Sequence, residues 1–537
     1  MNNTNSDILN INWKIPVDIK AKFAKNGNSA KIITRFSPEP SGYLHIGHAK
    51  AIYFNYYLAK RAGGKFIIRI DDTNPLKESL EFEQAIIFDI SSMGIVADLF
   101  SYSSDYYKQI VDITVGLINK GLVYYDSRSK EAIRLERVSY GSTIVLGTIS
   151  NILYNLECWE MFIDNHLDGV FRIRLDMCSK NGAMRDPIVF RKCEKVHPRT
   201  GFFVNPTYDY VCPLVDYLEE VSHVVRSTEF EDRNEQYRAI LQCIGVKIPE
   251  LITYGKLNFD GINLSKREIK KLISTNLVSG WDDPRLYTIA GLFRRGLSID
   301  ALKIYISEHG LSKKCPKEST TKLWAINEKK IDLLSVRYKV IKTDHLIVAC
   351  ITNYDKYANV SPAEWPNCLP KYKKNPQLGQ RPSIFSSNIL INREDLAPYF
   401  VYDNVADKNN KSLIPHDNRV IGQEITLIDI GNFIITNCQH STKLLELIID
   451  LEYVPNGDFK STECKVRWVD NETRIDVSLI EIGDIGSDAY TKEVLYVGEN
   501  SMTDLELDGY VQLVKMKGYY KCCDVDKIGR RVTLSKI

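Results

Sequence analysis

The sequence predicts an α/β protein in which a parallel sheet, interrupted by an insertion, is followed by helices and then by β-barrels. Residues 31–36, 48–61 and 65–70 alternate as strand, helix and strand, and this βαβ order indicates a parallel sheet. Beyond about residue 340 the pattern changes to short alternating apolar runs separated by Gly, Asn and Asp, which is typical of barrels. At 537 residues the chain is too long for one core, so we expect several domains.

The turn between the first strand and the helix carries the most chemical information. It contains the stretch RFSPEPSGYLHIGH at residues 35–48. Backbone N–H groups and the positive end of a helix dipole favour phosphate at such a helix start, and Gly47 lets a ligand approach the backbone. His45 and His48 lie one turn apart and can donate to phosphate oxygens as negative charge builds up. Two histidines alone are more often capping or surface residues, so the longer stretch carries the prediction.

The end of the second strand is a further place for ligand contacts. Asp71 and Asp72 follow it directly, at the edge where open α/β sheets place ligands, although paired acids there can also cap a helix. Residues 121–204 then break the alternation, which indicates an insertion between two halves of the sheet. The sheet is expected to resume near residues 206–212, and residues 256–338 show mainly a helical pattern.

Two later positions offer positive charge. Lys266 and Arg267 are adjacent cations, and on a mobile loop they could neutralise a pyrophosphate as it leaves, but the same residues would also suit a plain helix start. Arg226 offers a bidentate fork to a carboxylate. The alternative for Arg226 is an ordinary ion pair with Glu229 or Glu231.

Positively and negatively charged residues nearly balance over the whole chain. Its net charge is only +2, so any RNA contact must come from local basic patches. The candidate patches are residues 371–374 and the lysines between 313 and 322, although such runs are often solvated surface. Neither a run of 18 apolar residues nor a secretory signal is evident, so a cytosolic protein is expected.

The twelve cysteines do not suggest a metal site. They include no CxxC pair, and the closest ligand pattern, Cys193 with His197, has no second half nearby. We therefore expect free thiols and no structural zinc.

These motifs together resemble class I aminoacyl-tRNA synthetases. Residues 35–48 resemble the HIGH signature, residues 38–44 resemble its glutamyl and glutaminyl branch, and residues 264–268 resemble the KMSKS loop. Further stretches from 206 to 229 and from 280 to 338 resemble the eukaryotic and archaeal glutamyl enzymes. The sequence departs from the family pattern at Ser37, Asn263, Leu264 and Cys212, and residues 127–160 fit it poorly.

The resemblance implies a Rossmann-like catalytic domain and a division of the chain. The implied parts are a flexible lead-in at 1–27, the first half of the catalytic domain at 28–120, an inserted tRNA acceptor-binding domain at 121–204, the second half at 205–256, a helical domain with the KMSKS-like loop at 257–338, and two anticodon-binding β-barrels at 339–537, the distal one at roughly 400–475.

The resemblance also implies roles for particular residues. The implied catalytic residues are His45, His48 and Lys266, and those for glutamate are Arg35, Asp71, Tyr208 and Arg226. The implied ATP-binding residues are Pro38, Gly47, His48, Glu229, Leu264, Ser265, Lys266 and Arg267, and those for tRNA are Glu39, Lys373 and Lys374. No protein metal ligand is implied.

The implied activity is that of a cytoplasmic glutamate–tRNA ligase. Such an enzyme activates L-glutamate with ATP and Mg²⁺ and transfers it to the 3′ end of tRNA(Glu). A glutaminyl enzyme is the nearest alternative, against which Arg226 and Ser41 argue. A nucleotidylyltransferase would share HxGH without needing barrels, and a non-catalytic RNA-binding relative would not need both signatures. Partners in a multi-synthetase assembly are left open.

Overall fold

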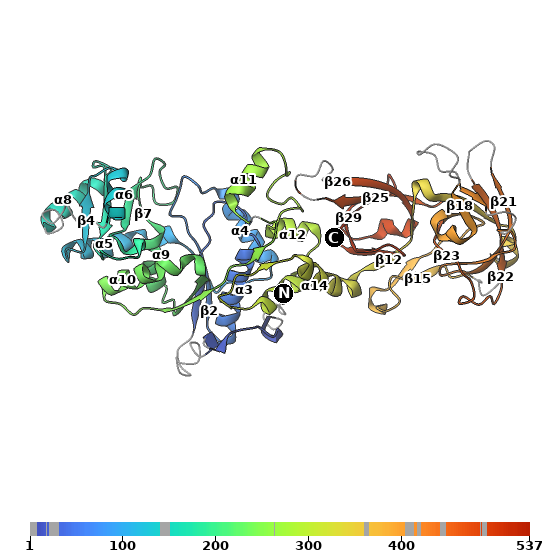
Figure 1. The fold of residues 1–537 in the computed structure, drawn as a ribbon, viewed down its shortest axis with the longest axis horizontal. Coiled ribbons are helices and arrows are strands. Elements are labelled where there is room, and N and C mark those ends of the chain that lie inside the picture. Colours follow the sequence, from blue (N-terminus) through green and yellow to red (C-terminus); the bar gives the residue numbers. More distant parts are fainter. Residues whose placement is uncertain are drawn as a thin grey trace. The chain divides into compact units, whose positions relative to one another are not determined.

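The computed structural model describes most of the chain in two compact units (Figure 1). The described residues are 8–17, 19–20, 32–139, 151–262, 264–358, 365–402, 413–415, 420–440, 447–483, 485 and 491–537, with the backbone alone at 400–402, 413–415, 440 and 491. The first unit is Met1–Gly291 with Ile299–Leu323, and the second is Leu292–Ser298 with Trp324–Ile537. Each unit is described by itself.

The first unit is built on a parallel sheet. Strand β1 (Ile33–Phe36) pairs in parallel with β2 (Lys65–Ile70), which pairs in parallel with β3 (Leu99–Tyr102). Helix α3 (Ile46–Arg61) connects β1 to β2. The predicted βαβ order is confirmed, while Lys31, the predicted start of the first strand, lies outside the described residues.

Part of the predicted flexible lead-in is packed. The indole of Trp13 stacks on the ring of Tyr57 in α3 with 4.7 Å between centroids, and its N–H donates to the backbone oxygen of Ile8 at 3.0 Å. Residues 8–17 are therefore ordered, because burial of a large aromatic ring beside α3 removes apolar surface from water. Most of the remaining lead-in up to residue 27 lies outside the described residues.

A second pair of parallel strands continues the sheet. Strand β8 (His223–Ser227) pairs with β9 (Glu250–Tyr254), and the backbone N–H of Ser222 donates to the oxygen of Ile33 at 3.0 Å. Strand β8 therefore begins beside β1, and the carboxyl ends of β1, β2 and β8 lie at one edge of the sheet. Parallel strands end in this way where α/β folds bind their ligands.

The sheet does not resume at residues 206–212 as predicted. Helix α9 (Tyr208–Leu218) begins there, and α10 (Asn234–Ile244) follows β8. Pro213 lies in the second turn of α9 and has no N–H to donate to the backbone oxygen four residues earlier.

The insertion forms an antiparallel sheet of its own. Its strands, in the order β4-β5-β6-β7, are Val123–Asp126, Val170–Ile173, Ile188–Lys192 and Val204–Pro206. Helices α6 (Lys130–Ser139) and α8 (Ile152–Ile163) belong to the same region. Its core is rich in aromatic rings, namely those of Trp159, Phe162, Phe171 and Phe190.

The remaining elements of the first unit are mostly helices. They are α4 (Leu80–Ser92), α5 (Tyr107–Asn119), α11 (Lys266–Ser274) and α13 (Ile299–His309), with a short pair of strands, β10 (Asn258–Phe259) and β11 (Lys317–Glu318). Helix α12 (Ile289–Arg295) spans the boundary of the units, and α14 (Thr321–Ile331) begins at the next boundary.

The second unit contains two seven-stranded sheets, in line with the predicted barrels. The order of one is β12-β27-β28-β29-β25-β26-β13, with strands Val336–Tyr338, Tyr510–Leu513, Tyr520–Asp526, Arg531–Lys536, Ile475–Ile482, Thr491–Gly498 and Val340–Lys342. The order of the other is β23-β20-β21-β22-β14-β17-β24, with strands Lys465–Val466, Glu424–Leu427, Gly431–His440, Leu447–Val454, Leu346–Ile351, Asn388–Asn392 and Trp468–Asp470. Shorter elements are α15 (Tyr354–Ala358) and the strand pairs β15–β16 (Cys368–Pro370, Gln380–Pro382) and β18–β19 (Phe400–Tyr402, Leu413–Pro415).

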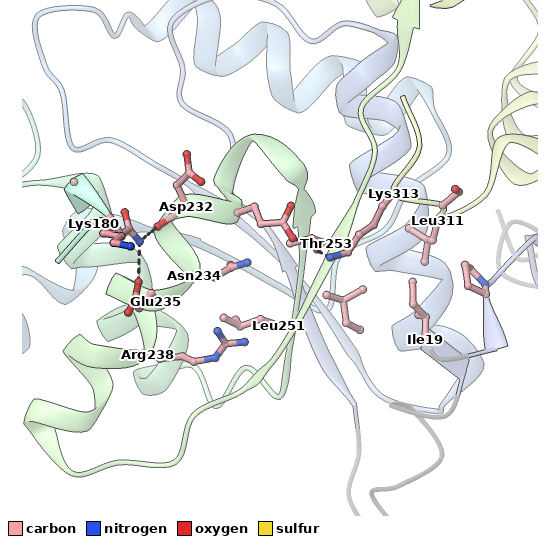
Figure 2. Close-up of a pocket in the computed structure, with 16 residues that line it drawn as sticks. Ile19, Lys180, Asp232, Asn234, Glu235, Arg238, Leu251, Thr253, Leu311 and Lys313 are labelled. Carbon is pink, nitrogen blue, oxygen red and sulfur yellow. Dashed lines mark hydrogen bonds and ion pairs between the residues drawn. The ribbon is translucent and has the colours of Figure 1, made fainter. Parts of the chain in front are cut away.

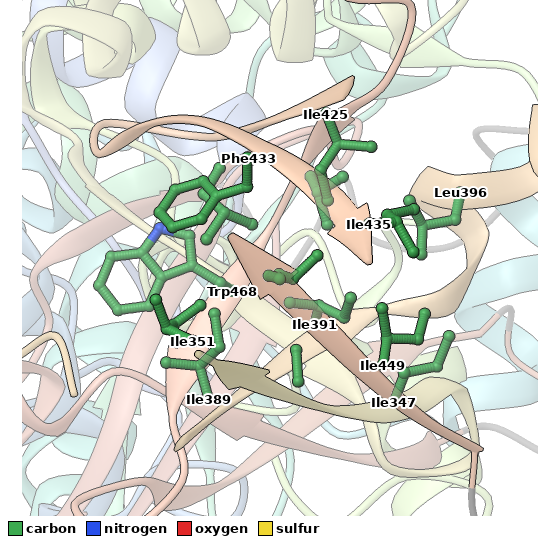
Figure 3. Packing of buried hydrophobic residues seen from close by; sticks show 14 of the residues in the cluster. Ile347, Ile351, Ile389, Ile391, Leu396, Ile425, Phe433, Ile435, Ile449 and Trp468 are labelled. Atoms are coloured by element: carbon green, nitrogen blue, oxygen red, sulfur yellow. The ribbon is translucent and has the colours of Figure 1, made fainter. Parts of the chain in front are cut away.

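Both sheets curl into nearly closed barrels. The two end strands of the first are separated by Lys339 alone, and those of the second by Arg467 alone, so the opposite edges of each sheet must come close together. Inward-facing apolar side chains fill the second barrel, with Trp468 and Phe433 beside a group of isoleucines (Figure 3). The predicted fold class, a parallel-sheet α/β domain with an insertion, helices and barrels, is confirmed.

Candidate active site

Two imidazoles lie together at the start of α3. The Nδ1 atom of His45 accepts a hydrogen bond from the Gly47 N–H at 3.1 Å, and the Nδ1 atom of His48 accepts one from the His45 N–H at 3.1 Å. The ring centroids are 3.8 Å apart. Since each Nδ1 atom is an acceptor, each neutral ring carries its proton on Nε2. Both side chains can therefore donate an N–H to a ligand.

Both rings stay neutral near pH 7. Burial, together with the positive charge of Lys266, lowers the pKa of His45 to about 3. Burial also lowers the pKa of His48 well below its usual range, and His45 and Lys266 add to the shift. The rings therefore act as hydrogen-bond donors rather than as cations.

Close packing fixes the turn that carries these histidines. A Cβ atom at Gly47 would lie 2.9 Å from the ring of His45, and one at Gly42 would lie 2.7 Å from the ring of Trp281. Tyr43 stacks on the same indole with 5.7 Å between centroids. Neither glycine has room for a larger residue, so the turn keeps its shape only with glycine at both positions.

The second signature meets the first. Lys266 is the first residue of α11, and its Nζ atom donates to the backbone oxygen of Glu39 at 2.9 Å and to Oγ of Ser41 at 3.3 Å. Burial lowers the pKa of Lys266 to about 8, while Glu39 opposes the shift, so the amine remains mostly charged at pH 7. Ile269 of α11 packs in one apolar cluster with Trp281, which anchors the helix beside the turn.

Asp71 presents an unpaired carboxylate oxygen at the end of β2. The residue is 5% exposed, and its Oδ1 atom is buried without a hydrogen-bond partner among the described residues. Burial raises the pKa of Asp71 to about 7, with further upward contributions from Asp72 and Glu39, while a hydrogen bond from Thr73 opposes the shift. Such a group is suited to a cation brought by a ligand.

Asp72 has a structural role instead. Its carboxylate accepts hydrogen bonds from the backbone N–H of Ser104 at 2.9 Å and from the Ser104 hydroxyl at 2.5 Å. Its backbone oxygen lies 2.6 Å from Nε2 of His197, a buried ring whose Nδ1 atom accepts the N–H groups of Arg199 and Thr200 at 3.2 Å. The loop of the insertion that contains His197 thereby holds the segment that follows β2. This contact explains His197 without a metal.

Arg35 is occupied by a buried carboxylate. Its Nε and Nη2 atoms donate to Asp216 at 3.0 and 3.1 Å, and Nη2 also lies 3.2 Å from the sulfur of Cys212. Asp216 also accepts hydrogen bonds from Arg69 and, at 2.9 Å, from the hydroxyl of Tyr237. The structure therefore places Arg35 at the expected edge of the sheet but commits part of its guanidinium to Asp216.

Arg226 has a different environment. It is 7% exposed at the end of β8, and its Nε and Nη2 atoms donate to the side-chain oxygen of Asn234 at 3.0 and 2.5 Å. The alternative pairing with Glu229 or Glu231 is not found, because each of these carboxylates binds a lysine at 2.9 Å. Among the described residues, no carboxylate forms an ion pair with Arg226.

Tyr208 connects the predicted glutamate-binding residues. Burial raises the pKa of its hydroxyl well above the usual value, Cys212 and Asp71 add to the shift, and the charges of Arg35 and Arg226 oppose it. These groups must lie near Tyr208 to act on it, so the structure brings the predicted quartet of Arg35, Asp71, Tyr208 and Arg226 together.

Some of the other predicted ligand-binding residues lie beside the two histidines, and the rest lie away from them. Pro38 is buried in the turn, Leu264 lies 3.9 Å from a Cβ placed at Gly47, and Ser265 and Arg267 are exposed next to Lys266. Glu229 is largely exposed and paired with Lys256, so no contact links it to the histidines.

Lys373 and Lys374 belong to the second unit, where both are exposed and Lys373 pairs with Asp429 at 3.0 Å. Asn263 lies outside the described residues.

A cavity of about 940 Å³ lies next to this region rather than at the histidines (Figure 2). It is lined by residues of α10 and β9, among them Asn234, Arg238 and Thr253, and by the loop around Asn181. The side chain of Asn181 closes one side by donating to Asp232 at 2.7 Å and to Glu235 at 3.0 Å. Because Asn234 holds Arg226, the wall of this cavity supports one of the predicted glutamate-binding residues.

Sequence reasoning missed two residues of the site, Asp216 and Asn234, and considered His197 only as half of a metal-ligand pattern. Asp216 could have been noticed as an acid within the apolar part of α9 beyond its first turn, since a charge there requires a buried partner. No sequence signal identifies Asn234, because its partner lies eight residues away across a bend.

Neither a metal site nor a membrane-spanning helix is found in the described part of the chain. It contains no group of three or more His, Cys, Asp or Glu side chains arranged around a metal position. It also contains no helix with the length and apolarity needed to cross a bilayer. The twelve cysteines are free thiols.

Comparison with known proteins agrees with this geometry. Residues 31–333 match the catalytic domain of class I tRNA synthetases (E and Q), and residues 335–453 match the anticodon-binding domain of the same class. The probable cytoplasmic glutamate–tRNA ligase of Vairimorpha ceranae is 36% identical over 529 residues, which cover 96% of this chain and 81% of that relative. The corresponding Encephalitozoon cuniculi protein is 35% identical, with 92% and 74% covered, and the cytoplasmic glutamate–tRNA ligase of Saccharomyces cerevisiae is 31% identical, with 95% and 71% covered. This chain therefore belongs to the class I tRNA synthetases of the E and Q group.

Proposed function

We propose that this protein is a cytoplasmic glutamate–tRNA ligase. The observation that carries the proposal is the environment of Arg226, a buried guanidinium that forms no ion pair with a carboxylate of the described residues. A substrate carboxylate would supply the missing negative charge, and a bidentate fork suits carboxylate geometry. The names of the relatives support the same substrate and the same compartment.

The amino acid would be held at both ends. Arg226 would bind the γ-carboxylate, with Arg35 contributing a donor that Asp216 does not use, and Tyr208 would add a hydrogen bond. Asp71, whose Oδ1 atom lacks a donor among the described residues, would bind the α-ammonium group. These two anchors leave the α-carboxylate to face the nucleotide.

The first chemical step would be activation of glutamate. Its α-carboxylate attacks the α-phosphate of ATP, a new C–O–P bond forms, and pyrophosphate leaves with the electrons of the broken P–O bond. His45 and His48 would donate their Nε2 protons as hydrogen bonds to the phosphate oxygens, and Lys266 would stabilise the charge on the leaving group. Mg²⁺ would accompany ATP and neutralise charge on its phosphates.

The second step would transfer glutamate to tRNA. The 2′-hydroxyl of the terminal ribose attacks the carbonyl carbon of the adenylate, and AMP leaves. No covalent enzyme intermediate is required, so positioning and electrostatic stabilisation carry the rate. The insertion at 121–204 would hold the acceptor end near Glu39, and the barrels within 339–537 would contact the anticodon arm, with Lys373 and Lys374 among the contacts.

Isotope exchange between ATP and pyrophosphate tests this function. The assay is run with glutamate and with glutamine, each with and without tRNA, and is followed by charging of purified tRNA(Glu). We expect exchange and charging with glutamate. A preference for glutamine would identify the sister activity, and exchange with neither amino acid would favour a non-catalytic RNA-binding protein or a nucleotidylyltransferase for another substrate.

A further inference from the structure

The partner of Arg226 is a neutral amide. Asn234, the first residue of α10, accepts two hydrogen bonds from the guanidinium through its side-chain oxygen, at 3.0 and 2.5 Å. Figure 2 shows Asn234 beside Asp232 and Glu235, in the wall of the cavity next to the sheet. An amide oxygen orients a guanidinium but leaves its charge in place.

Most acids near Arg226 form ion pairs with other cations. Arg35 and Arg69 share Asp216, and Arg69 also binds Glu219 at 2.9 Å. The remaining acids that flank β8 and α10 have partners of their own, in the pairs Asp209–Arg233, Glu229–Lys256 and Glu231–Lys313. Arg226 is therefore the guanidinium of this buried group that forms no ion pair with a described carboxylate, although the charges of Arg226 and Asp209 act on each other.

Aromatic rings shield this charge from water. The centre of the Arg226 guanidinium lies 5.1 Å from the ring centroid of Tyr237 and 5.7 Å from that of Phe230. In such a water-poor environment the interaction between two charges is much stronger than at the surface. A single added negative charge at this position would therefore have a large effect on a negatively charged ligand.

We propose that Asn234 determines the preference for glutamate over glutamine, because it orients Arg226 without supplying a negative charge that would offset the guanidinium. This inference rests on the proposed function. Asn234 acts through Arg226 and is a positioning residue. A carboxylate at the same place would neutralise Arg226 internally, so the γ-carboxylate of glutamate would meet no net positive charge, whereas the neutral amide of glutamine would be much less affected.

The substitution Asn234→Asp tests this directly, because the two side chains have nearly the same shape. An acid is also compatible with the start of a helix, so the change should not disturb α10. The kcat/KM of tRNA charging is measured for glutamate and for glutamine in the full-length enzyme. We expect the value for glutamate to fall about 100-fold and the value for glutamine to fall less than about threefold.

Two further variants separate charge from structure. Asn234→Ser removes the amide oxygen without adding a charge, so the loss of orientation at Arg226 should lower the ratio of glutamate to glutamine use much less than Asn234→Asp does. Gln242→Glu adds a negative charge on an exposed position of the same helix, and should leave both values unchanged. The upward shift in melting temperature caused by ATP should persist in all three variants, which reports a folded nucleotide site.

The outcomes distinguish the inference from the function. An Asn234→Asp enzyme that keeps the wild-type ratio overturns the inference, and so does one that loses glutamate and glutamine use to the same extent, because that result indicates a purely structural role. A wild-type enzyme that prefers glutamine, or that charges neither, overturns the proposed function itself.

Discussion

The Nζ atom of Lys266 lies 2.9 Å from the backbone oxygen of Glu39, although 227 residues separate them in the chain. This contact places a buried amine against the turn that ends in His45 and His48. The two histidines provide neutral donors and the lysine provides a positive charge, so in the proposed activation step the three groups would share the stabilisation of a charged phosphate. The first prediction follows from this division.

Lys266→Ala should slow activation far more than it weakens ATP binding. The amine is proposed to act on charge that peaks in the transition state, so its loss should cost about 2 to 4 kcal/mol in kcat/KM for pyrophosphate exchange. Lys270→Ala is the matched control, since Lys270 lies one turn further along α11 over the ring of Phe82. Near-normal exchange in Lys266→Ala would remove this residue from the proposed site.

Glutamate use should depend on pH through Asp71. The pKa of this carboxyl is raised to about 7 in the free enzyme, chiefly by burial, and the ionised form is the one that binds an ammonium group. As pH falls below about 7, Asp71 takes up a proton, so kcat/KM for glutamate should fall about tenfold per pH unit; it should be highest between about pH 7 and 8, because above that range Lys266 loses its proton. The value of kcat should vary less, because bound ammonium keeps the carboxyl ionised.

The two histidines of the site do not account for this pH dependence. Histidines cannot produce it, since the pKa of His45 is about 3 and that of His48 is also far below 7, so both are neutral throughout the range. Asp71→Asn should abolish the dependence along with most of the activity. A wild-type profile that is flat down to pH 6 would show that Asp71 does not bind the ammonium group.

Short sequence patterns predicted those parts of the site whose structure depends on neighbouring residues in the chain. Strand β2 begins and ends at the predicted residues, and the histidines lie at a helix start as expected, because hydrophobic alternation and a turn rich in Pro and Gly specify them. The ion pairs could not be predicted in this way. Asp216 meets Arg35 across 181 residues, and Glu229 binds Lys256 rather than Arg226, because the fold brings a lysine closer.

Asp216→Asn should destabilise the first unit. Asp216 is fully buried and binds two arginines, so removing its charge leaves Arg35 and Arg69 without compensation, at a cost of about 3 to 5 kcal/mol. Thermal unfolding measures this in the transition that ATP shifts upward. Glu231→Gln breaks an exposed pair and should cost less than about 1 kcal/mol. Equal effects of the two changes would mean that the buried pair contributes no special stability.

Binding of tRNA should weaken with salt, and Lys374 should contribute more than Lys313. Lys374 is exposed with no carboxylate partner in the described part of the chain, whereas Lys313 already pairs with Glu231 at 2.9 Å. Lys374→Glu should weaken tRNA binding about tenfold at 0.1 M salt and reduce the slope of log affinity against log salt by about one. Lys313→Glu should change affinity less than about threefold. The reverse order would move the RNA contact to the first unit.

Arg226→Cys is the most demanding test of the proposed function. The substitution removes the unbalanced positive charge and leaves the substrate γ-carboxylate desolvated with only Arg35 nearby, a guanidinium already committed in part to Asp216. Losing one partner of a buried pair costs about 3 to 5 kcal/mol, so kcat/KM for glutamate should fall by more than about 100-fold. Use of glutamine should fall less or even rise, because its amide no longer meets an unpaired guanidinium.

Arg233→Cys is the matched control, since Arg233 lies over the same Phe230 ring but forms an exposed pair with Asp209, and it should keep the preference for glutamate. An Arg226→Cys enzyme that still prefers glutamate by the wild-type ratio would show that another residue reads the γ-carboxylate.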